Sequence, residues 1–290
     1  MTSAATFDHL VVIDWSAAAT PRLGADSIWC AWLDTRCGEI DLTNIATRHA
    51  AIDMLASRLA DADGRVLVGV DFPLGHPVGH AAAAALITDD EPRAWRATWT
   101  HLARNLAAPP DDAGDRWRVA ADLNRRLGTP HYWGAPPSRA GAHLTSTRPI
   151  ARRLADDRLT EERLRAGGRR PFTVWQLLGA GSVGSQAITG IALLERLRAR
   201  FADDLHIWPF DTGIDRVPDA PIVIAEVWPS AIDVDHVEHP VKDARQVIAL
   251  AEWLADAQRA GRLASMFTPR VDPADVDRVV DEEGWVLGVT

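Results

Sequence analysis

The feature that most constrains this chain is a short apolar run, residues 10–13, that ends directly in a carboxylate, Asp14. A branched apolar run without alternation is typical of a strand buried on both faces of a sheet. A charged side chain at its last position must leave that core. It is therefore expected at the carboxyl edge of the sheet, where open α/β folds place their sites. The run predicts an α/β fold with a candidate site at one sheet edge.

Two later runs repeat this pattern. Residues 65–71 end their expected strand at Asp71, and residues 221–227 carry Glu226 near the strand end. Parallel strands end at the same edge of a sheet. We therefore expect three separate segments to bring a carboxylate to one place.

A fourth acid comes from the clearest helical pattern in the chain, residues 242–261. Val247, Leu250 and Leu254 form its apolar stripe, and Asp243 lies on the same stripe one turn earlier. The side chain of Asp243 is therefore expected to face the sheet from the first turn of this helix.

Several carboxylates at one edge repel each other unless a cation neutralises them. Mg²⁺ or Mn²⁺ with oxygen ligands serves that purpose, and two such ions are the standard arrangement for in-line phosphoryl transfer. The predicted catalytic and metal-binding residues are Asp14, Asp71, Glu226 and Asp243. Asp211, at the end of the run 205–211, is a further candidate.

The order of the elements constrains the sheet. Short turns between the expected strands 9–14, 27–34 and 39–46 predict an antiparallel meander. Helical spacing over residues 48–62 then separates the meander from the strand 65–71. A helix between two strands implies a right-handed crossover, so this fourth strand is predicted to run parallel to the first.

The middle of the chain carries little strand signal. Residues 76–200 are predicted to form a long helical insertion, or cap, on a core made of residues 1–75 and 201–290. Helices are expected over residues 80–87, 92–107, 116–128 and 148–167. A further strand is expected over residues 205–211, and the segment 284–287 is either a short strand or a docking tail.

Charge is distributed unevenly. The chain has a net charge of −9, but residues 151–200 hold ten Arg and five acidic residues. The ordinary interpretation is a solvated, arginine-rich helical surface. The functional interpretation is a face that contacts nucleic acid or a phosphate ester beside the acidic edge.

The same segment contains the sequence Gly-Ala-Gly-Ser-Val-Gly over residues 179–184. It matches a dinucleotide-binding fingerprint, but the preceding strand is weak and the expected distant acid is missing. A close-packed turn, or an anion-holding turn at a helix N-terminus, fits better. His76 and His80 follow Asp71 and are either loop residues or a general base near it, and Trp133 is a candidate for base stacking.

These motifs resemble family 429 of the domains of unknown function, which are predicted RNase-H-like nucleases. The resemblance rests on Val-Val-Ile-Asp14, Val-Gly-Val-Asp71-Phe-Pro-Leu-Gly, Glu226-Val-Trp-Pro-Ser and Lys242-Asp243-Ala-Arg. It implies a ribonuclease-H-like mixed sheet flanked by helices. It also implies that the four acids are metal ligands.

The expected function is metal-dependent cleavage of a phosphodiester. One alternative is an actin-like or sugar-kinase-like ATP-binding phosphotransferase, which usually needs a Gly-rich phosphate turn after the first strand; the residues after Asp14 offer none. A second alternative is a catalytically inactive RNase-H-like binding module. The sequence leaves the substrate and the oligomeric state open.

No apolar run approaches the ~20 residues that a membrane span requires. The sequence begins without the basic and apolar regions of a signal peptide. We therefore expect a cytoplasmic protein that does not associate with membranes.

Overall fold

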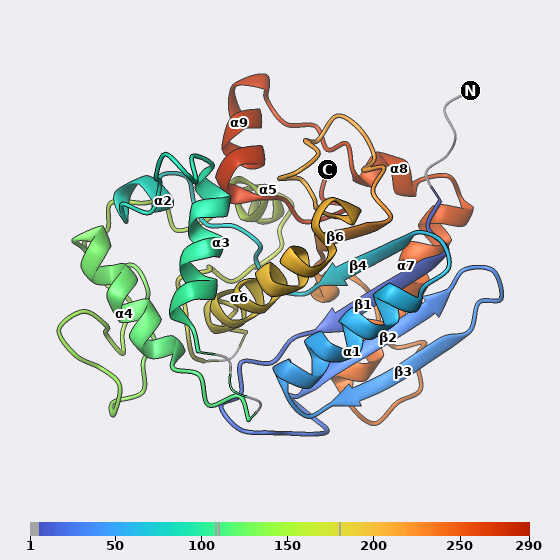
Figure 1. The fold of residues 1–290 in the computed structure, drawn as a ribbon, viewed down its shortest axis with the longest axis horizontal. Coiled ribbons are helices and arrows are strands. Elements are labelled where there is room, and N and C mark those ends of the chain that lie inside the picture. Colours follow the sequence, from blue (N-terminus) through green and yellow to red (C-terminus); the bar gives the residue numbers. More distant parts are fainter. Residues whose placement is uncertain (1–5, 108, 110, 180) are drawn as a thin grey trace.

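The computed structural model describes residues 6–107, 109, 111–179 and 181–290, and shows a six-stranded mixed sheet flanked by helices (Figure 1). The sheet order is β3-β2-β1-β4-β6-β5. The strands are β1 (His9–Asp14), β2 (Ile28–Asp34), β3 (Ile40–Ile45), β4 (Val66–Val70), β5 (Leu205–Ile207) and β6 (Ile222–Glu226). The predicted α/β class with a mixed sheet is confirmed.

The strand directions also agree with those predicted from the sequence. β1 pairs with β2, and β2 with β3, in antiparallel ladders, which confirms the predicted meander. β4 pairs with β1 in parallel, and the helix α1 (Arg48–Asp61) connects β3 to β4. Thr47 caps that helix by accepting a hydrogen bond from the backbone N–H of Ala50. β6 continues the parallel half of the sheet beside β4.

Helices cover both faces of the sheet. Besides α1 they are α2 (His80–Ala83), α3 (Ala94–Asn105), α4 (Arg116–Leu127), α5 (Leu159–Ala166), α6 (Gly184–Phe201), α7 (Lys242–Arg259), α8 (Leu263–Met266) and α9 (Val276–Arg278). α1 and α6 lie in front of the sheet in Figure 1, and α7 lies behind it. Within the described residues, no helix combines the length and the apolar character needed to cross a membrane.

The two faces of β1 belong to two different cores. Val11 and Ile13 pack in the cluster that includes α1, α3 and α6, whereas Leu10 and Val12 pack in the cluster that includes α7. All four side chains are fully buried. The uninterrupted apolar run therefore reflects burial on both faces, as predicted.

Three predicted elements are shorter than the sequence indicated. α2 ends at Ala83, and the helix expected over 148–167 exists only as α5. β5 has three residues, because the chain turns directly after it, where the backbone N–H of Asp211 donates to the carbonyl oxygen of Ile207 at 2.9 Å. The segment 284–287 forms a single parallel bridge, in which Val286 lies beside Glu226 at the end of β6.

The N-terminal half of α6 lies close to the carboxyl ends of β1 and β4. Phe72, just after β4, packs against Gly190 so tightly that a Cβ there would lie 2.3 Å from the phenyl ring. Trp15, just after β1, packs against Phe72 with the ring planes tilted by 53° and donates its indole N–H to the hydroxyl of Thr189. α6 is thereby held against the sheet edge that carries Asp14.

Candidate functional site

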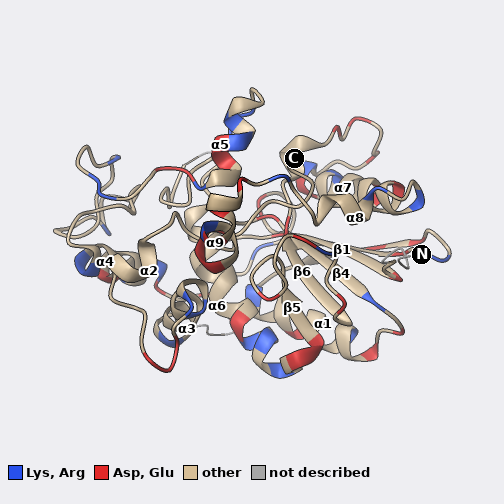
Figure 2. Cartoon of the chain, turned by 90° about the horizontal axis from the view of Figure 1, so that it is seen from above, with Lys and Arg blue, Asp and Glu red and all other residues tan. Residues whose placement is uncertain are grey.

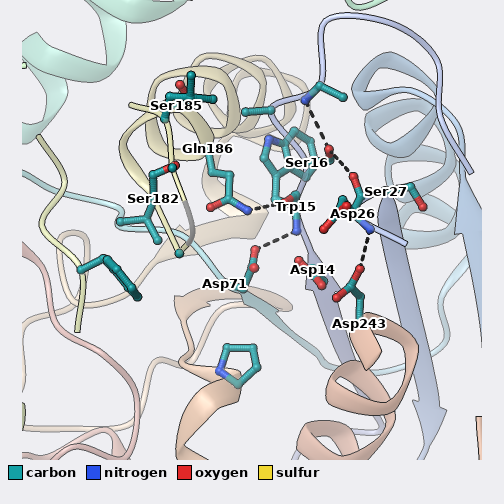
Figure 3. Close-up of a pocket in the computed structure, with 18 of the residues that line it drawn as sticks. Asp14, Trp15, Ser16, Asp26, Ser27, Asp71, Ser182, Ser185, Gln186 and Asp243 are labelled. Carbon is teal, nitrogen blue, oxygen red and sulfur yellow. Dashed lines mark hydrogen bonds between the residues drawn. The ribbon is translucent and has the colours of Figure 1, made fainter. Parts of the chain in front are cut away.

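An open cavity of about 540 Å³ lies at the carboxyl edge of β1 and β4. Three of the four predicted acids line it, namely Asp14, Asp71 and Asp243. In Figure 3, Asp14 lies between Asp71 and Asp243, with α6 on the opposite side. The structure thus brings together acids from two strands and one helix.

The strand register explains why Asp14 and Asp71 meet. Ile13 of β1 lies opposite Val70 of β4, so the next residue of each chain segment is Asp14 or Asp71. Side chains one position later on neighbouring parallel strands point to the same face of the sheet. The negative charges of the two carboxyl groups act on each other, and Oδ1 of Asp71 accepts a hydrogen bond of 2.8 Å from the backbone N–H of Trp15.

The shared environment of these two acids changes their protonation. Burial, followed by the negative charge of Asp71, raises the pKa of Asp14 well above its usual value. Burial also raises the pKa of Asp71 to about 6, although hydrogen bonds from Asp14 and the Trp15 N–H oppose that shift. Two adjacent carboxylates that cannot both ionise cheaply will hold a proton or a cation between them.

Asp243 reaches the cavity from the first turn of α7, as its position on the helical stripe predicted. Its Oδ2 accepts a hydrogen bond of 2.8 Å from the backbone N–H of Asp26, in the loop before β2 (Figure 3). The charge of Asp243 raises the pKa of both Asp14 and Asp71, after the larger effect of burial. Asp243 therefore belongs to the same electrostatic site.

Glu226 does not line this cavity, and the ligand set expected from the sequence is corrected accordingly. Val70 lies opposite Glu226 itself, so the β6 residue beside Asp71 is Val227. The one-residue offset turns the Glu226 side chain to the other face of the sheet. There it is buried and accepts two hydrogen bonds from the guanidinium of Arg158, at 2.6 and 2.7 Å.

The wall opposite the acids comes from the Gly-rich segment and the start of α6. Gly179, Gly181, Ser182, Ser185 and Gln186 all line the cavity, whereas Ala180 lies outside the described residues. The motif predicted to form a close-packed turn or an anion-holding turn therefore faces the acidic edge. Figure 3 shows the two serines and the glutamine on this side.

One cavity residue had no signal in the sequence. Arg116, the first residue of α4, is 8% exposed and lines the cavity beside Ser185. Its Nε donates to the Ser185 hydroxyl at 2.8 Å. Burial, followed by the nearby guanidinium of Arg48, lowers the pKa of Arg116 to about 10, so the side chain remains a cation at neutral pH.

The predicted basic segment contributes shape to the cavity more than charge. Its residues along the cavity wall, from 172 to 186, carry no formal charge. Arg152, Arg158, Arg165 and Arg198 are paired with acids. In Figure 2, basic and acidic positions lie side by side on the outer helices. Binding of nucleic acid or a phosphate ester by this segment stays a prediction.

Two further candidates lie away from the cavity. The carboxylate of Asp211 accepts a hydrogen bond of 2.8 Å from the backbone N–H of Ile207 and closes the turn after β5. Trp133 lines a separate, smaller cavity, of which Phe172 forms the boundary with the main one. Neither Asp211 nor Trp133 therefore touches the acidic edge.

His76 and His80 also lie outside the cavity, in a buried aromatic cluster. Their rings stack with centroids 4.3 Å apart, against Tyr132 and Trp175. Burial lowers the pKa of His76 to about 3 and that of His80 well below its usual value. Both ring nitrogens of His76 lack a partner within the described residues. These histidines are neutral core residues in this structure.

Acidification is therefore expected to destabilise the protein through this pair. The unfolded chain binds protons on these histidines below its pKa of about 6.5, whereas the folded chain does not. Each histidine lowers the free energy of unfolding by about 1.4 kcal/mol per pH unit below that value, until the folded pKa is reached. Urea unfolding should show that the free energy of unfolding falls less between pH 7 and pH 5 in His76→Phe than in wild type. The exposed control His236→Phe should keep the wild-type slope.

The donor set fits one kind of metal site. Among the described residues, no group of three or more His, Cys, Asp or Glu side chains is positioned to enclose an ion. Asp14 and Asp71, however, present adjoining carboxyl groups to an open cavity. Mg²⁺ is commonly held by one or two carboxylates together with water and substrate phosphates. The arrangement suits such a site and does not suit a closed protein cage.

Comparison of the chain with protein-family models, curated proteins and solved structures found no match.

Proposed function

We propose that the protein is a Mg²⁺- or Mn²⁺-dependent phosphoester hydrolase, acting as a nuclease or phosphodiesterase. The observation that supports this most is the pair formed by Asp14 and Asp71 at the edge of an open cavity. Arg22 and Lys242 also line that cavity, yet within the described residues neither forms an ion pair with these two acids. The negative charge of Asp14 and Asp71 is therefore available to bind a proton or a cation.

The residues of the site have distinct tasks under this proposal. Asp14 and Asp71 would hold the ion, and Asp243 would add negative charge and bind its water shell. A bound divalent ion lowers the pKa of water and offsets the charge that develops on the phosphoryl oxygens. The Trp15 N–H fixes one oxygen of Asp71, and the Asp26 N–H fixes one oxygen of Asp243. These contacts orient the carboxylates before any ligand arrives.

The topology supports a ribonuclease-H-like fold for this chain. Three antiparallel strands, a crossover helix and a parallel strand beside β1 follow the order expected from that fold. Asp14 is the last residue of β1 and Asp71 directly follows β4, and these are the two central strands of the sheet. The resemblance to family 429 and its nuclease assignment remains a proposal on this basis.

A cleavage assay tests the proposed function. Purified full-length protein should hydrolyse bis-p-nitrophenyl phosphate, single-stranded DNA or RNA in the presence of Mn²⁺ or Mg²⁺. EDTA should remove that activity, and added Mn²⁺ should restore it, because the two-carboxylate site needs the ion as its Lewis acid. Hydrolysis that persists in EDTA would contradict a metal-dependent mechanism. Metal binding without turnover on any of these substrates would support the inactive binding module instead.

One observation also favours a second candidate, an ATP-binding phosphotransferase. The Gly-rich segment around Gly179 and Gly181 faces Asp14 and Asp71 across the same cavity. A glycine turn before a helix N-terminus is a common way to bind nucleotide phosphates. A rise in melting temperature with MgATP, absent with Mg²⁺ alone, would favour this function over the hydrolase.

A further inference from the structure

Arg116 is a buried cation without an anionic partner in the described part of the chain. Its Nε donates to Ser185, and its terminal nitrogens donate to no acceptor there. The charge of Asp115 acts on Arg116, but its carboxylate is paired with Arg139. The buried acid Asp112 is engaged by Arg48, through the guanidinium and through a backbone N–H that donates to both carboxylate oxygens. An unpaired buried guanidinium is costly unless a ligand supplies the missing charge.

The first turn of α6 adds donors beside this cation. The backbone N–H groups of Ser185 and Gln186 donate to no acceptor within the described residues, and both residues line the cavity. The helix is 18 residues long, so its N-terminus carries the positive end of a full helix dipole. Such a terminus favours an anion that accepts several hydrogen bonds.

The contacts around Ser185 hold these donors in place. Its hydroxyl donates to the carbonyl oxygen of Leu177 at 2.7 Å and accepts from Arg116 at 2.8 Å. Ser185 is 2% exposed, so the hydroxyl that holds the Arg116 side chain is itself buried. Gln186 is fixed in turn, because its amide donates to the carbonyl oxygen of Trp15. The cationic wall and the acidic edge are therefore connected through Trp15.

We propose that Arg116 and the first turn of α6 form a phosphate-binding subsite, which receives a phosphoryl group of the substrate. A guanidinium and backbone N–H groups together match the several acceptor oxygens of a phosphate. The subsite faces Asp14 and Asp71 across one cavity, so a phosphate held there lies on the side opposite the acids. The inference deepens the proposed function by naming the group recognised, but binding at this subsite does not itself need a metal.

Calorimetric titration of the full-length protein with inorganic phosphate, in EDTA and at fixed ionic strength, tests the subsite. Wild type should bind phosphate saturably, and Arg116→Met should weaken binding by about tenfold or more, as expected for loss of a charge-assisted contact. Arg116→Lys should weaken it less, because the charge stays and the planar fork is lost. Arg125→Met, which removes an exposed arginine of the same helix, is the matched control and should bind like wild type.

Ser185→Ala provides a second variant that keeps the cation and the backbone donors. It should weaken phosphate binding several-fold while the far-ultraviolet circular dichroism stays native. The proposal is overturned if wild type shows no saturable binding, or if folded Arg116→Met binds phosphate as tightly as wild type. If Arg116→Met does not fold, unchanged affinity in both Arg116→Lys and Ser185→Ala overturns it.

The two proposals can fail separately. Arg116-dependent phosphate binding in a protein that cleaves no phosphoester with any metal would retain the subsite and reject the hydrolase. Metal-dependent cleavage by a protein whose phosphate affinity does not change in Arg116→Met would retain the hydrolase and reject the subsite. Asp14→Asn should bind phosphate in EDTA at least as tightly as wild type, because it removes a negative charge from the same cavity.

Discussion

Asp14→Asn should lose metal-dependent phosphoester cleavage, by a factor of about a hundred or more, and should be more stable than wild type at neutral pH. Activity falls because an amide oxygen is a poor substitute for a carboxylate on a divalent ion. Stability rises because the native pair must otherwise ionise two adjoining, half-buried carboxyl groups. The asparagine amide can instead donate a hydrogen bond to Asp71, which takes over the role of the shared proton.

The sign of the stability effect follows from the raised pKa values. A carboxyl group whose pKa is higher in the folded than in the unfolded chain stabilises the fold at low pH. That contribution is lost as pH rises from the unfolded value of about 3.8 through the folded value, which for Asp71 is about 6. The increase in the free energy of unfolding caused by Asp14→Asn should therefore be small at pH 4.5 and reach about 1–3 kcal/mol at pH 8.

Urea unfolding at these two pH values measures the effect, and cleavage in Mn²⁺ measures the activity. Asp203→Asn is a suitable control, because Asp203 is exposed and does not line the cavity. Asp203→Asn should change the free energy of unfolding by no more than about 0.5 kcal/mol. The cleavage rate should change by no more than the factor that corresponds to this energy. Full Mn²⁺-dependent activity in Asp14→Asn would remove this residue from the mechanism. A loss of stability at pH 8 would show that the pair is not under charge strain.

The part of the site on β1 and β4 was predictable because apolar runs locate buried strands directly. Residues 10–13 and 66–70 are fully apolar apart from one glycine, and each is followed at once by an acid. When a buried strand ends in a charged residue, that side chain can reach solvent only at the edge of the sheet where the strand ends. The parallel crossover between the two strands then followed from the helix that separates them. Asp243 was predictable for a similar reason, from helical periodicity.

Glu226 shows where this reasoning stops. Its run resembles the other two, and a sequence pattern does not give the register between strands. A shift of one residue along β6 turns Glu226 toward Arg158 and leaves Val227 in the row of Asp14 and Asp71. Because strand side chains alternate with a period of two, an offset of one residue decides which face a carboxylate joins.

Arg116 could not have been predicted from the chain alone. It begins an amphipathic helix that is rich in arginine, and nothing in its neighbours distinguishes it from the exposed Arg125. Its burial depends on Ser185, which comes from α6, and on Asp112, which neutralises the adjacent Arg48. Contacts between distant segments determine which arginine faces the cavity.

Arg158→Met should cause the largest loss of stability of any charge removal considered for this chain, about 3–5 kcal/mol at pH 7. Arg158 is fully buried and donates to both carboxylate oxygens of Glu226, to Glu161, and to the backbone carbonyl oxygen of Glu283. These contacts tie the segment before α5 to the end of β6 and to the C-terminal turn. Removing the cation leaves two buried glutamates without a positive charge beside them, although each still accepts a backbone hydrogen bond, from Leu74 N–H or from the N–H of residue 158.

The paired side chains set the direction of this effect. Burial already raises the pKa of Glu161, and the charge and hydrogen bonds of Arg158 oppose that rise. Without Arg158, Glu161 should take up a proton more readily, so the stability deficit of Arg158→Met should shrink as the pH falls toward 5. Arg165→Met removes an arginine of the same segment whose partner is Asp157 and whose side chain is 43% exposed. That control should cost no more than about 1 kcal/mol.

Chemical denaturation of both variants and of Glu226→Gln separates a structural role from a catalytic one. Glu226→Gln should also be destabilised, because Arg158 then keeps only Glu161 as its anionic partner. At a temperature where that variant is folded, metal-dependent cleavage should persist, since Glu226 lies on the face of the sheet opposite Asp14. A folded Glu226→Gln protein without activity would return this carboxylate to the catalytic site. A loss of less than about 1 kcal/mol in Arg158→Met would show that the buried network does not hold the segment to the sheet.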